Sequence, residues 1–545
     1  MSWASILNHF PWKHPSEKLK TVESSQKELT ISSSYLIIAL GLVFLWRFLF
    51  SLHMNLLPDE CSYWTWSRFL DWSYFDNSGM TAYLIRISTE IFGKSTPFSV
   101  RFPFLILSGL TTYFLYRTSQ LLFRDSYRAL LVATLFNLAP IALLGGSLAM
   151  HDNALMFFWT LALWAAAHFL RNSVGKWFFV MGLAAGLAIQ SKYTGILILP
   201  CLLSFFLWSR QHRPWLLRPE PWIGVGIAVA CTLPILWWNF LHEWASLGHI
   251  LFIGSGATSW TRRLSDGFGY HIAQFLLISP LWYVTLLATY GSVAIRAARD
   301  SKPEEKLLLC FSLPLLLFGV QSFWGHVEAN WGVMGYLALS ILAVEAISRA
   351  NREKQPRILH RFTPSYFRWA LVLALGLSVC VVLHAWIGLL PACIEANIAK
   401  EDRIIWETRG WDGLGIHVGA LRKSDDVVAG DSYQLCALLE FNIPGQPLVR
   451  YLAPWNRPTQ FDVRDPSFDS LKGTNILFVS PRPLQPSSPV RTTIYEHFAR
   501  VEELPAYEVL YHGIPIRHVY VYRGYSFDPF IPHPLGPRSL RYDRK

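Results

Sequence analysis

The sequence is poor in charged residues for its length. Of 545 residues, 16% are charged, whereas 52% are hydrophobic and 15% are aromatic. A soluble domain usually carries about a quarter charged residues, so the composition excludes an ordinary soluble protein and predicts a multi-span membrane protein. The net charge of +11 does not indicate a nucleic-acid partner, because the basic residues stand between apolar runs, where cytoplasmic loops of membrane proteins carry them.

Three further features are absent. Internal repeats are not visible, which speaks against a transporter built of symmetric halves. The first 30 residues contain neither an apolar core nor a small-residue cleavage site, so we expect no removable signal peptide and a first span that acts as an anchor. Paired cysteine spacings are also missing, which predicts neither a disulfide framework nor a zinc site. The seven cysteines are Cys61, Cys201, Cys231, Cys310, Cys380, Cys393 and Cys436.

Long apolar runs are what the sequence has instead. A helix needs about 20 apolar residues to cross a bilayer, and we predict about eleven spans. The runs lie near residues 35–54, 98–117, 128–148, 153–170, 177–190, 194–209, 222–241, 271–295, 307–324, 332–348 and 369–391. Between them, residues 81–96 read as a short amphipathic helix that lies in the membrane interface, with Arg86 and Glu90 spaced i, i+4.

The connections between these runs divide into two sets. One set is basic, which places it and the N-terminus in the cytoplasm. The basic residues are Lys13, Lys18, Lys20 and Lys27 before the first span, then Arg117, Arg124, Arg128, Arg171, Lys176, Arg210, Arg213, Arg218, Arg296, Arg299, Lys302, Lys306, Arg349, Arg352, Lys354, Arg357 and Arg361. The other set is then extracytoplasmic. It contains Asp59, Glu60, Asp76, Asp152, Lys192, His242, Glu243, His326, Glu328 and Asn330.

Residues 57–80 are the most distinctive extracytoplasmic stretch. They place the adjacent acids Asp59 and Glu60 just after the first span, followed by aromatic residues that include Tyr63 and Trp66. Aromatic rings can stack on a sugar, and a carboxylate can take a proton from a hydroxyl. The alternative is a plain aromatic belt at the bilayer surface. The gathering of all such polar motifs on one face favours a site.

This stretch resembles the first outer loop of the protein mannosyltransferase and aminoarabinose transferase superfamily. The matching residues are Pro58-Asp59-Glu60, then Tyr63-x-x-Trp66-Ser67 and Asp71-Trp72-x-Tyr74-Phe75-Asp76. The resemblance continues through His151-Asp152-Asn153-Ala154-Leu155, Gln190-Ser191-Lys192-Tyr193-Thr194-Gly195 and Glu328-Ala329-Asn330-Trp331. It implies a polyprenyl-phosphate-dependent glycosyltransferase of the GT-C fold. Where bacterial members usually carry His-Pro-Pro after the second acid, this chain has Asn77-Ser78-Gly79, which replaces two rigid residues with flexible ones.

The resemblance implies roles for the acids. Asp59 matches the base that deprotonates the acceptor hydroxyl while the sugar leaves its lipid phosphate with inversion. Because adjacent residues cannot share a helix face, Asp59 and Glu60 divide the work, one pointing into the site and the other elsewhere. Asp152 is either a site residue or the N-terminal cap of the following span. We take Asp59, Glu60 and Asp152 as the candidate catalytic residues.

A second group of residues is predicted to bind substrate. Lys192, at the outer end of a span, suits a lipid phosphate, although lysines at span ends also extend to lipid headgroups without a specific ligand. Asp76 either binds sugar hydroxyls or holds Arg86 or the turn at Ser73. Arg262 and Arg263 are weaker candidates for the phosphate. The full predicted set is Asp76, Lys192, Tyr63, Trp66, His326, Glu328, Asn330 and Trp331.

From about residue 395 the pattern changes to mixed polar sequence with Pro and Gly. Strand-like runs at 475–479 and 518–522, and a strand, turn and helix over 427–442, predict a soluble α/β domain of normal size. The expected organisation is a cytoplasmic segment 1–30, a transmembrane catalytic domain 31–394 and an extracytoplasmic domain 395–545. We expect the tail from Ser526 to be loosely ordered.

The leading hypothesis is a glycosyltransferase of the inner membrane that moves a sugar from a polyprenyl-phosphate donor to an acceptor on the outer face. An envelope glycolipid, such as lipid A or the lipopolysaccharide core, is the preferred acceptor, and Ser or Thr of a protein is the alternative. This chemistry needs one base and a cation for the phosphate, so no cofactor is obligatory; a divalent metal is compatible but not indicated. A transporter or an inactive scaffold is the alternative from another class.

Overall fold

The structure is a computed structural model of the chain. It describes residues 32–253, 259–299, 302–353, 364–388, 403–453, 457–485, 489–511 and 514–530. The predicted cytoplasmic segment 1–30 and the predicted domain boundary near residue 395 lie outside these ranges.

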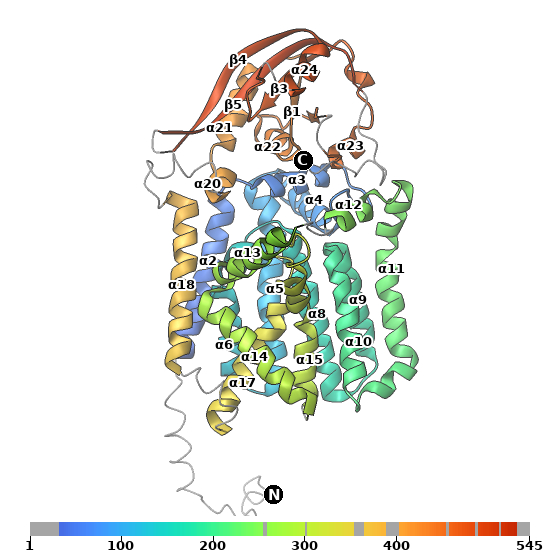
Figure 1. Cartoon of the computed structure of the whole chain (residues 1–545), viewed down its shortest axis with the longest axis vertical. Coiled ribbons are helices and arrows are strands. Elements are labelled where there is room, and N and C mark those ends of the chain that lie inside the picture. The colour runs from blue at the N-terminus through green and yellow to red at the C-terminus, as the bar shows by residue number, and fades with distance from the viewer. Residues whose placement is uncertain are drawn as a thin grey trace, which may run out of the picture.

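A bundle of roughly parallel helices forms one half of the molecule, and a β-sheet region covers one end of it (Figure 1). Within the described residues, five helices are long and apolar enough to cross a membrane. They are α2 (Ser33–His53), α5 (Pro97–Phe123), α8 (His151–Asn172), α11 (Pro219–Leu241) and α18 (Pro364–Ile387). A sixth span arises if α13 (Trp260–Ile278) and α14 (Pro280–Arg299), which meet at an angle of 112°, count as one bent span.

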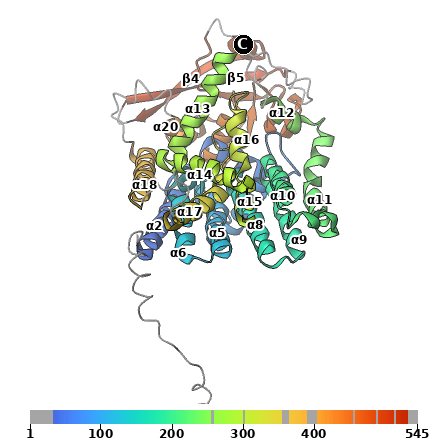
Figure 2. The ribbon, with the colours of Figure 1, turned by 60° about the horizontal axis from the view of Figure 1, so that its bottom comes forward.

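By length and composition, the described residues therefore contain fewer spans than the eleven predicted. Most of the other apolar runs fold as helices of 6 to 16 residues, which are shorter than the roughly 20 residues that a span needs, although they lie in the same bundle (Figure 2). Pro140 begins a new helix in one run, and a 3₁₀ turn, η2 (Tyr193–Leu197), interrupts another. These helices are α6 (Ser126–Leu138), α7 (Pro140–Gly145), α9 (Lys176–Ser191), α10 (Ile198–Trp208), α15 (Pro303–Phe311) and α16 (Leu313–Gln321). The run near residues 332–348 forms α17 (Gly335–Glu353), which carries charged residues at its end.

Short helices cover the end of the bundle that faces the sheet. They are α3 (Pro58–Arg68), α4 (Met80–Phe92) and α12 (Ala245–Ile253). The predicted amphipathic helix is confirmed as α4, which ends at Gly93 in the left-handed conformation, and Arg86 Nε lies 2.6 Å from Glu90 Oε1. At the opposite end, the 3₁₀ helix η3 (Arg213–Leu217) leads into α11.

The C-terminal region contains a five-stranded mixed sheet in the order β2-β1-β3-β5-β4. The strands are β1 (Asp426–Gly430), β2 (Val449–Tyr451), β3 (Asn475–Ser480), β4 (Phe498–Tyr511) and β5 (Ile514–Phe527). β1 pairs in parallel with β2 and β3, while β5 pairs antiparallel with β3 and β4. The helices are α20 (Arg403–Thr408), α21 (Trp411–Leu421), α22 (Tyr433–Asn442), α23 (Gln460–Arg464) and α24 (Pro489–Glu496), with the 3₁₀ turn η5 (Asp469–Leu471). The strand, turn and helix predicted over 427–442 are confirmed, whereas Ser526 and Phe527 belong to β5 and not to a loose tail.

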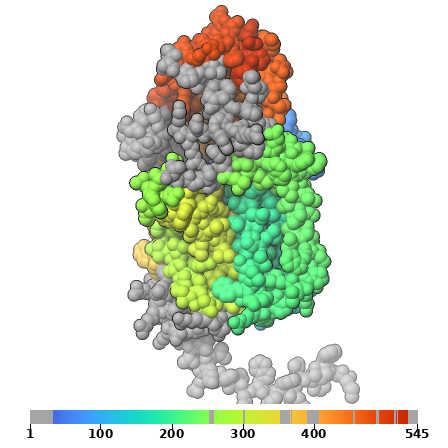
Figure 3. Space-filling view, turned by 45° about the vertical axis from the view of Figure 1, so that its right-hand side comes forward, coloured from blue at the N-terminus to red at the C-terminus, as the bar shows by residue number. Residues whose placement is uncertain are grey.

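The sheet region packs directly on the short helices. One buried cluster contains Leu56, Cys61 and Ile85 from the bundle side together with Leu435 and Val479 from the sheet side. The rings of Trp64 and Phe441 meet edge to face at 5.0 Å, and Arg68 Nη1 lies 2.7 Å from Glu440 Oε1. Figure 3 shows the C-terminal region as a cap at one end of the bundle. The interface between α3 and α22 is therefore part of the protein core.

Candidate active site

Asp59 lies in the first turn of α3, directly under the sheet region. Pro58 begins the helix, and acids are favoured in a first turn because the backbone N–H groups there are unpaired. Asp59 Oδ1 accepts a hydrogen bond of 3.1 Å from the Gln434 amide, which comes from α22. A residue of the C-terminal region thus touches the predicted base.

Glu60 points the other way, into the protein. Its side chain is fully buried, and its Oε2 lies 2.5 Å from Arg101 Nη2. Oε1 accepts from Arg101 Nε at 2.8 Å and from the Ala149 amide at 2.8 Å. The two adjacent acids therefore do divide, as expected, and Glu60 is the one that faces the core; its prediction as a catalytic group is replaced below by a different role.

Asp152, Lys192 and Asn330 come together from three separate segments. Asp152 lies in the first turn of α8, Lys192 follows the last residue of α9, and Asn330 precedes α17. Lys192 Nζ lies 2.7 Å from Asp152 Oδ1, and Asn330 Nδ2 donates to Asp152 Oδ2 at 2.8 Å. Both charged side chains keep 12–15% of their surface exposed, so the group is partly open to a ligand.

Asp76 forms a second acidic centre with two partners, Arg457 and His249. Arg457 Nη1 lies 2.8 Å from Asp76 Oδ1, and His249 Nε2 lies 3.4 Å from the same atom. Burial alone would raise the pKa of Asp76, but the charge of Arg457 and the hydrogen bond from His249 outweigh it and lower that pKa to about 2. The carboxylate is therefore ionised at neutral pH. The two partners expected for Asp76 are not used, because Arg86 pairs with Glu90 and Ser73 Oγ bonds to Asn77 O and Tyr193.

Tyr63 lies between these acids. Burial raises the pKa of its phenol well above the usual value, and the negative charges of Asp59, Asp152 and Asp76 raise it further. All three acids thus lie within electrostatic range of one hydroxyl, which stays protonated. The Tyr63 ring contacts Trp66 at 5.1 Å between centroids. Trp66 itself is buried and stacks on Tyr74 at 4.6 Å, so it supports the loop, and its role in sugar binding stays a prediction.

The predicted residues before α17 separate into two groups. His326 Nε2 and Glu328 Oε1 contact each other at 2.8 Å, and both side chains are more than half exposed. Trp331 packs edge to face on Phe318, with ring centroids 5.7 Å apart. Of this segment, only Asn330 contacts one of the acids in the hydrogen bonds described above, so the roles of His326, Glu328 and Trp331 stay predictions.

An apolar cavity of about 460 Å³ opens beside the segment that carries Asn330. Gln274 of α13 donates to Ala329 O at 2.9 Å and accepts from the Tyr336 hydroxyl at 2.7 Å, so the cavity wall is bonded to that segment. Arg262 and Arg263 both lie in the first turn of α13; Arg263 reaches the cavity lining, whereas Arg262 lies 3.9 Å from Asp266. The lining residues include Trp260, Arg263, Leu264, Tyr270, His271, Tyr283, Leu315, Phe323 and Tyr336.

Comparisons with known proteins fit this geometry. Residues 76–238 match the family described as dolichyl-phosphate-mannose-protein mannosyltransferase. The lipid A galacturonosyltransferase RgtD of Rhizobium johnstonii is 30% identical over 292 residues, which are 52% of this chain and 59% of that protein. The chain is therefore similar to these proteins over part of their length. The undecaprenyl phosphate-α-4-amino-4-deoxy-L-arabinose arabinosyl transferase 1 of Sodalis glossinidius is 26% identical over 459 residues, 77% of each chain.

Solved structures agree on the fold. The crystal structure of ArnT from Cupriavidus metallidurans bound to undecaprenyl phosphate has a TM-score of 0.59 at 17% identity, and the match covers 90% of this chain and 98% of that chain. The apo form of the same protein gives the same TM-score at 15% identity. The chain therefore has an ArnT-like GT-C fold: a helical membrane protein with a C-terminal mixed sheet.

Four site residues were not identified from the sequence: Arg101, His249, Gln434 and Arg457. Arg101 lies inside an apolar run, and the other three lie far along the chain from the acids that they contact. Of the four, only Arg101 offered a signal in the sequence, because a charged residue within a predicted span needs a buried partner. Among the described residues, no group of three or more His, Cys, Asp or Glu is arranged to hold a metal ion.

Proposed function

We propose that this protein is a glycosyltransferase that moves one sugar from a polyprenyl-phosphate donor to an envelope glycolipid on the outer face of the inner membrane. The observation that carries the proposal is that Asp59, Asp152 and Asp76 all act electrostatically on Tyr63, while Lys192 pairs with Asp152 and Arg457 pairs with Asp76. Such a site offers a base for an acceptor hydroxyl and positive charge for a departing phosphate.

Asp59 is the proposed base. It belongs to the first turn of a helix that the sheet region covers, its contact with the Gln434 amide holds one oxygen, and its charge acts on the phenol of Tyr63. Departure of the phosphate from the anomeric carbon, as the acceptor oxygen attacks from the opposite side, gives inversion. The base takes the proton of that oxygen as the new bond forms.

Lys192 is the proposed phosphate ligand, and the apolar cavity is the proposed place for the polyprenyl chain. The cavity is lined almost entirely by apolar side chains of α13, α14 and α16, and its wall is bonded through Gln274 to the segment whose Asn330 holds Asp152. A chain in the cavity would therefore bring its phosphate end toward Asp152 and Lys192. Arg263 at the cavity is a second cation for the same group.

The relatives support a lipid acceptor. The two curated relatives are named for lipid A galacturonosyl transfer and for aminoarabinose transfer from undecaprenyl phosphate. The family match is named for protein mannosylation, which makes a protein Ser or Thr the second candidate acceptor. The chain spans 59% of the first relative, so both acceptors and both sugars belong in the test.

The test is sugar transfer by purified full-length protein in lipid nanodiscs. The donors are undecaprenyl-phosphate-linked galacturonic acid and 4-amino-4-deoxyarabinose, the acceptors are lipid A and a Ser/Thr peptide, and the product is read by mass spectrometry. Asp59→Asn keeps the shape of Asp59 but removes its basicity, so turnover should fall about 10² to 10⁴-fold with binding retained. The exposed Asp469→Asn is the matched control. A variant Asp59→Asn with wild-type turnover would show that Asp59 is not the base.

A further inference from the structure

A fully buried ion pair, Glu60 with Arg101, lies immediately behind the proposed base. Arg101 comes from the first turns of α5 and Glu60 from the first turn of α3. The guanidinium and the carboxylate meet through two parallel contacts, Nε to Oε1 at 2.8 Å and Nη2 to Oε2 at 2.5 Å. This is the bidentate arrangement that only arginine can make with a carboxylate.

The carboxylate has its hydrogen-bonding capacity filled, and Arg101 makes four hydrogen bonds. Besides Arg101, Glu60 accepts from the Ala149 amide at 2.8 Å and from the Leu57 amide at 3.0 Å, so each oxygen accepts two bonds. Arg101 also donates to Met54 O at 2.6 Å and to Asn55 O at 2.8 Å. A saturated carboxylate with no exposed surface cannot reach an acceptor hydroxyl. It can hold backbone segments in fixed register.

The segments that it holds are the ones that carry the two proposed site acids. Asp59 precedes Glu60 directly, and Asp152 lies three residues after Ala149, whose amide is bound although it is 89 residues from Glu60 in sequence. The same loop is anchored at its other end by the buried Arg47, which donates to Ala142 O at 2.6 Å and to Leu143 O at 3.3 Å.

Stability alone does not account for such a pair. Removing two charges from water costs several kcal/mol per ion, and apolar side chains of similar volume usually replace a buried pair at little or no loss of stability. We propose that Glu60 and Arg101 are positioning residues, which fix the segment carrying Asp59 against the segment carrying Asp152 so that base and phosphate site keep one separation. The role of this pair in turnover rests on the function proposed above.

The first experiment compares the double variant Glu60→Met/Arg101→Met with the wild type in nanodiscs. The thermal midpoint should fall only slightly, because the apolar pair removes the cost of burying two charges but leaves the Leu57 and Ala149 amides and two backbone carbonyls without these partners. The kcat should fall about 100-fold, the effect of a displacement near 1 Å, while the KM for the donor stays within about twofold, because the Lys192 site itself is intact. A purely structural pair would lower stability and leave the kcat of the folded fraction unchanged; that result would overturn the proposal.

The matched control replaces another enclosed ion pair far from the site. Arg128 of α6 contacts Glu345 of α17 at the opposite end of the bundle, and their side chains are 16% and 9% exposed. Arg128→Met/Glu345→Met should leave kcat at the wild-type value. If this control loses as much kcat as Glu60→Met/Arg101→Met, the effect is general loosening and the proposal fails.

A second readout does not depend on turnover. Hydrogen–deuterium exchange of the peptides that contain residues 57–60 and 146–152 should accelerate at least about tenfold in Glu60→Met/Arg101→Met, since the Leu57 and Ala149 amides lose their acceptor. Unchanged exchange would refute the proposal that Glu60 and Arg101 hold these two segments together. If the wild type transfers none of the tested sugars, the proposed function fails on that result. The exchange data still decide whether Glu60 and Arg101 hold the two segments together.

Arg101→Lys tests whether the positive charge of Arg101 or its two parallel contacts matter. It also tests the proposal if the double variant does not fold. Lysine keeps the positive charge but cannot make the two parallel contacts. We expect a loss in kcat of about tenfold or more at an unchanged thermal midpoint. Wild-type kcat in Arg101→Lys would mean that charge alone suffices, and the positioning role would be wrong.

Discussion

A single substitution at Lys192 tests whether this residue binds the donor phosphate. Its ammonium lies 2.7 Å from Asp152, so it either binds the donor phosphate or only neutralises that acid. A lost charge-assisted contact costs about 1.5–3 kcal/mol. Lys192→Ala should therefore raise the donor KM about 10- to 100-fold and leave the acceptor KM unchanged, as steady-state kinetics with each substrate varied would show.

The double variant Asp152→Asn/Lys192→Ala provides the control for this prediction. If Lys192 only neutralises Asp152, removal of both charges should restore the donor KM. If Lys192 binds phosphate, the donor KM should stay raised. Restoration in the double variant would thus contradict the phosphate role.

Asp76 predicts how the contact between sheet region and bundle depends on pH. Its pKa is lowered to about 2 by Arg457 and His249 against the opposing effect of burial, whereas in the unfolded chain it stays near 4. A lowered pKa means that the contact stabilises the fold fully above pH 4 and loses this contribution as the pH falls from 4 toward 2. The midpoint difference between wild type and Asp76→Asn should therefore be constant from pH 5 to pH 8 and shrink below pH 4.

Thermal unfolding at each pH, with Asp469→Asn as the exposed control, measures this difference. An advantage of the wild type that shrinks already between pH 8 and pH 6 would show that a group other than Asp76 controls the contact.

The residues that could be predicted from sequence are those whose chemistry is visible without a partner. Asp59, Asp76, Asp152, Lys192 and Asn330 stood out as polar residues at the outer ends of apolar runs. Their pairing could not be predicted, because Lys192 meets Asp152 and Arg457 meets Asp76 only after segments far apart in sequence fold together.

The same limit applied to the direction in which the adjacent acids point. Helix geometry requires that Asp59 and Glu60 face different ways, but only the buried Arg101 shows which of them faces the core.

Helices α9 and α11 illustrate a contact that depends on the absence of side chains. A Cβ added at Gly182 would lie 2.1 Å from Gly224 O, and one added at Gly224 would lie 2.5 Å from Phe178 O. The two backbones touch, as small residues permit between membrane helices. Gly182→Ala should therefore lower stability by about 1–3 kcal/mol, although alanine is the better helix former.

Gly226→Ala on α11 is the matched control, because a Cβ there meets nothing within 4 Å. This variant should be neutral or gain up to about 1 kcal/mol. Thermal unfolding of both proteins in the same detergent gives the comparison. Equal midpoints for the two variants would mean that α9 and α11 can separate at no cost.

Helices and strands with a clear period were predicted well, and interrupted runs were not. The amphipathic α4 and the buried β3 follow patterns that a local stretch defines. The break at Pro140 divides one apolar run, and the 3₁₀ turn after Lys192 takes up the start of the run near residues 194–209, so hydropathy alone overestimated the number of full-length spans.

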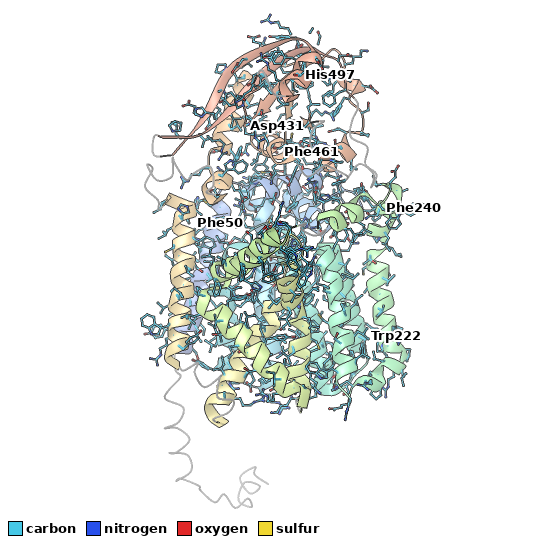
Figure 4. All side chains as sticks on the ribbon, viewed as in Figure 1. Phe50, Trp222, Phe240, Asp431, Phe461 and His497 are labelled. Atoms are coloured by element: carbon cyan, nitrogen blue, oxygen red, sulfur yellow. The ribbon has the colours of Figure 1, made fainter. Side chains whose placement is uncertain are left out.

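The polar motifs and the basic residues lie at opposite ends of the whole molecule. Figure 4 labels Trp222 and Phe240 at the two ends of α11, with Phe461 and Asp431 between the bundle and the sheet. The Asp152 end of α8 lies on the sheet side. The junctions of α8 with α9, of η3 with α11 and of α14 with α15, which carry the arginines and lysines, lie at the far end.

This arrangement predicts the orientation in the membrane. Lys and Arg remain on the cytoplasmic side, so the end with Arg213 should face the cytoplasm, and the sheet region with Gly473 should be outside.

Alkaline phosphatase is active only outside the cytoplasm, whereas a fluorescent protein that cannot fold after export reports the inside. Fusions after Arg213 should therefore fluoresce and lack phosphatase activity, and fusions after Gly473 should show the reverse. A fusion after Arg171, at the same end as Arg213, is the internal control. Because α11 alone separates the two ends of the bundle by its full length, the same compartment for Arg213 and Gly473 would contradict the membrane placement and would remove the outer-face site from the proposed mechanism.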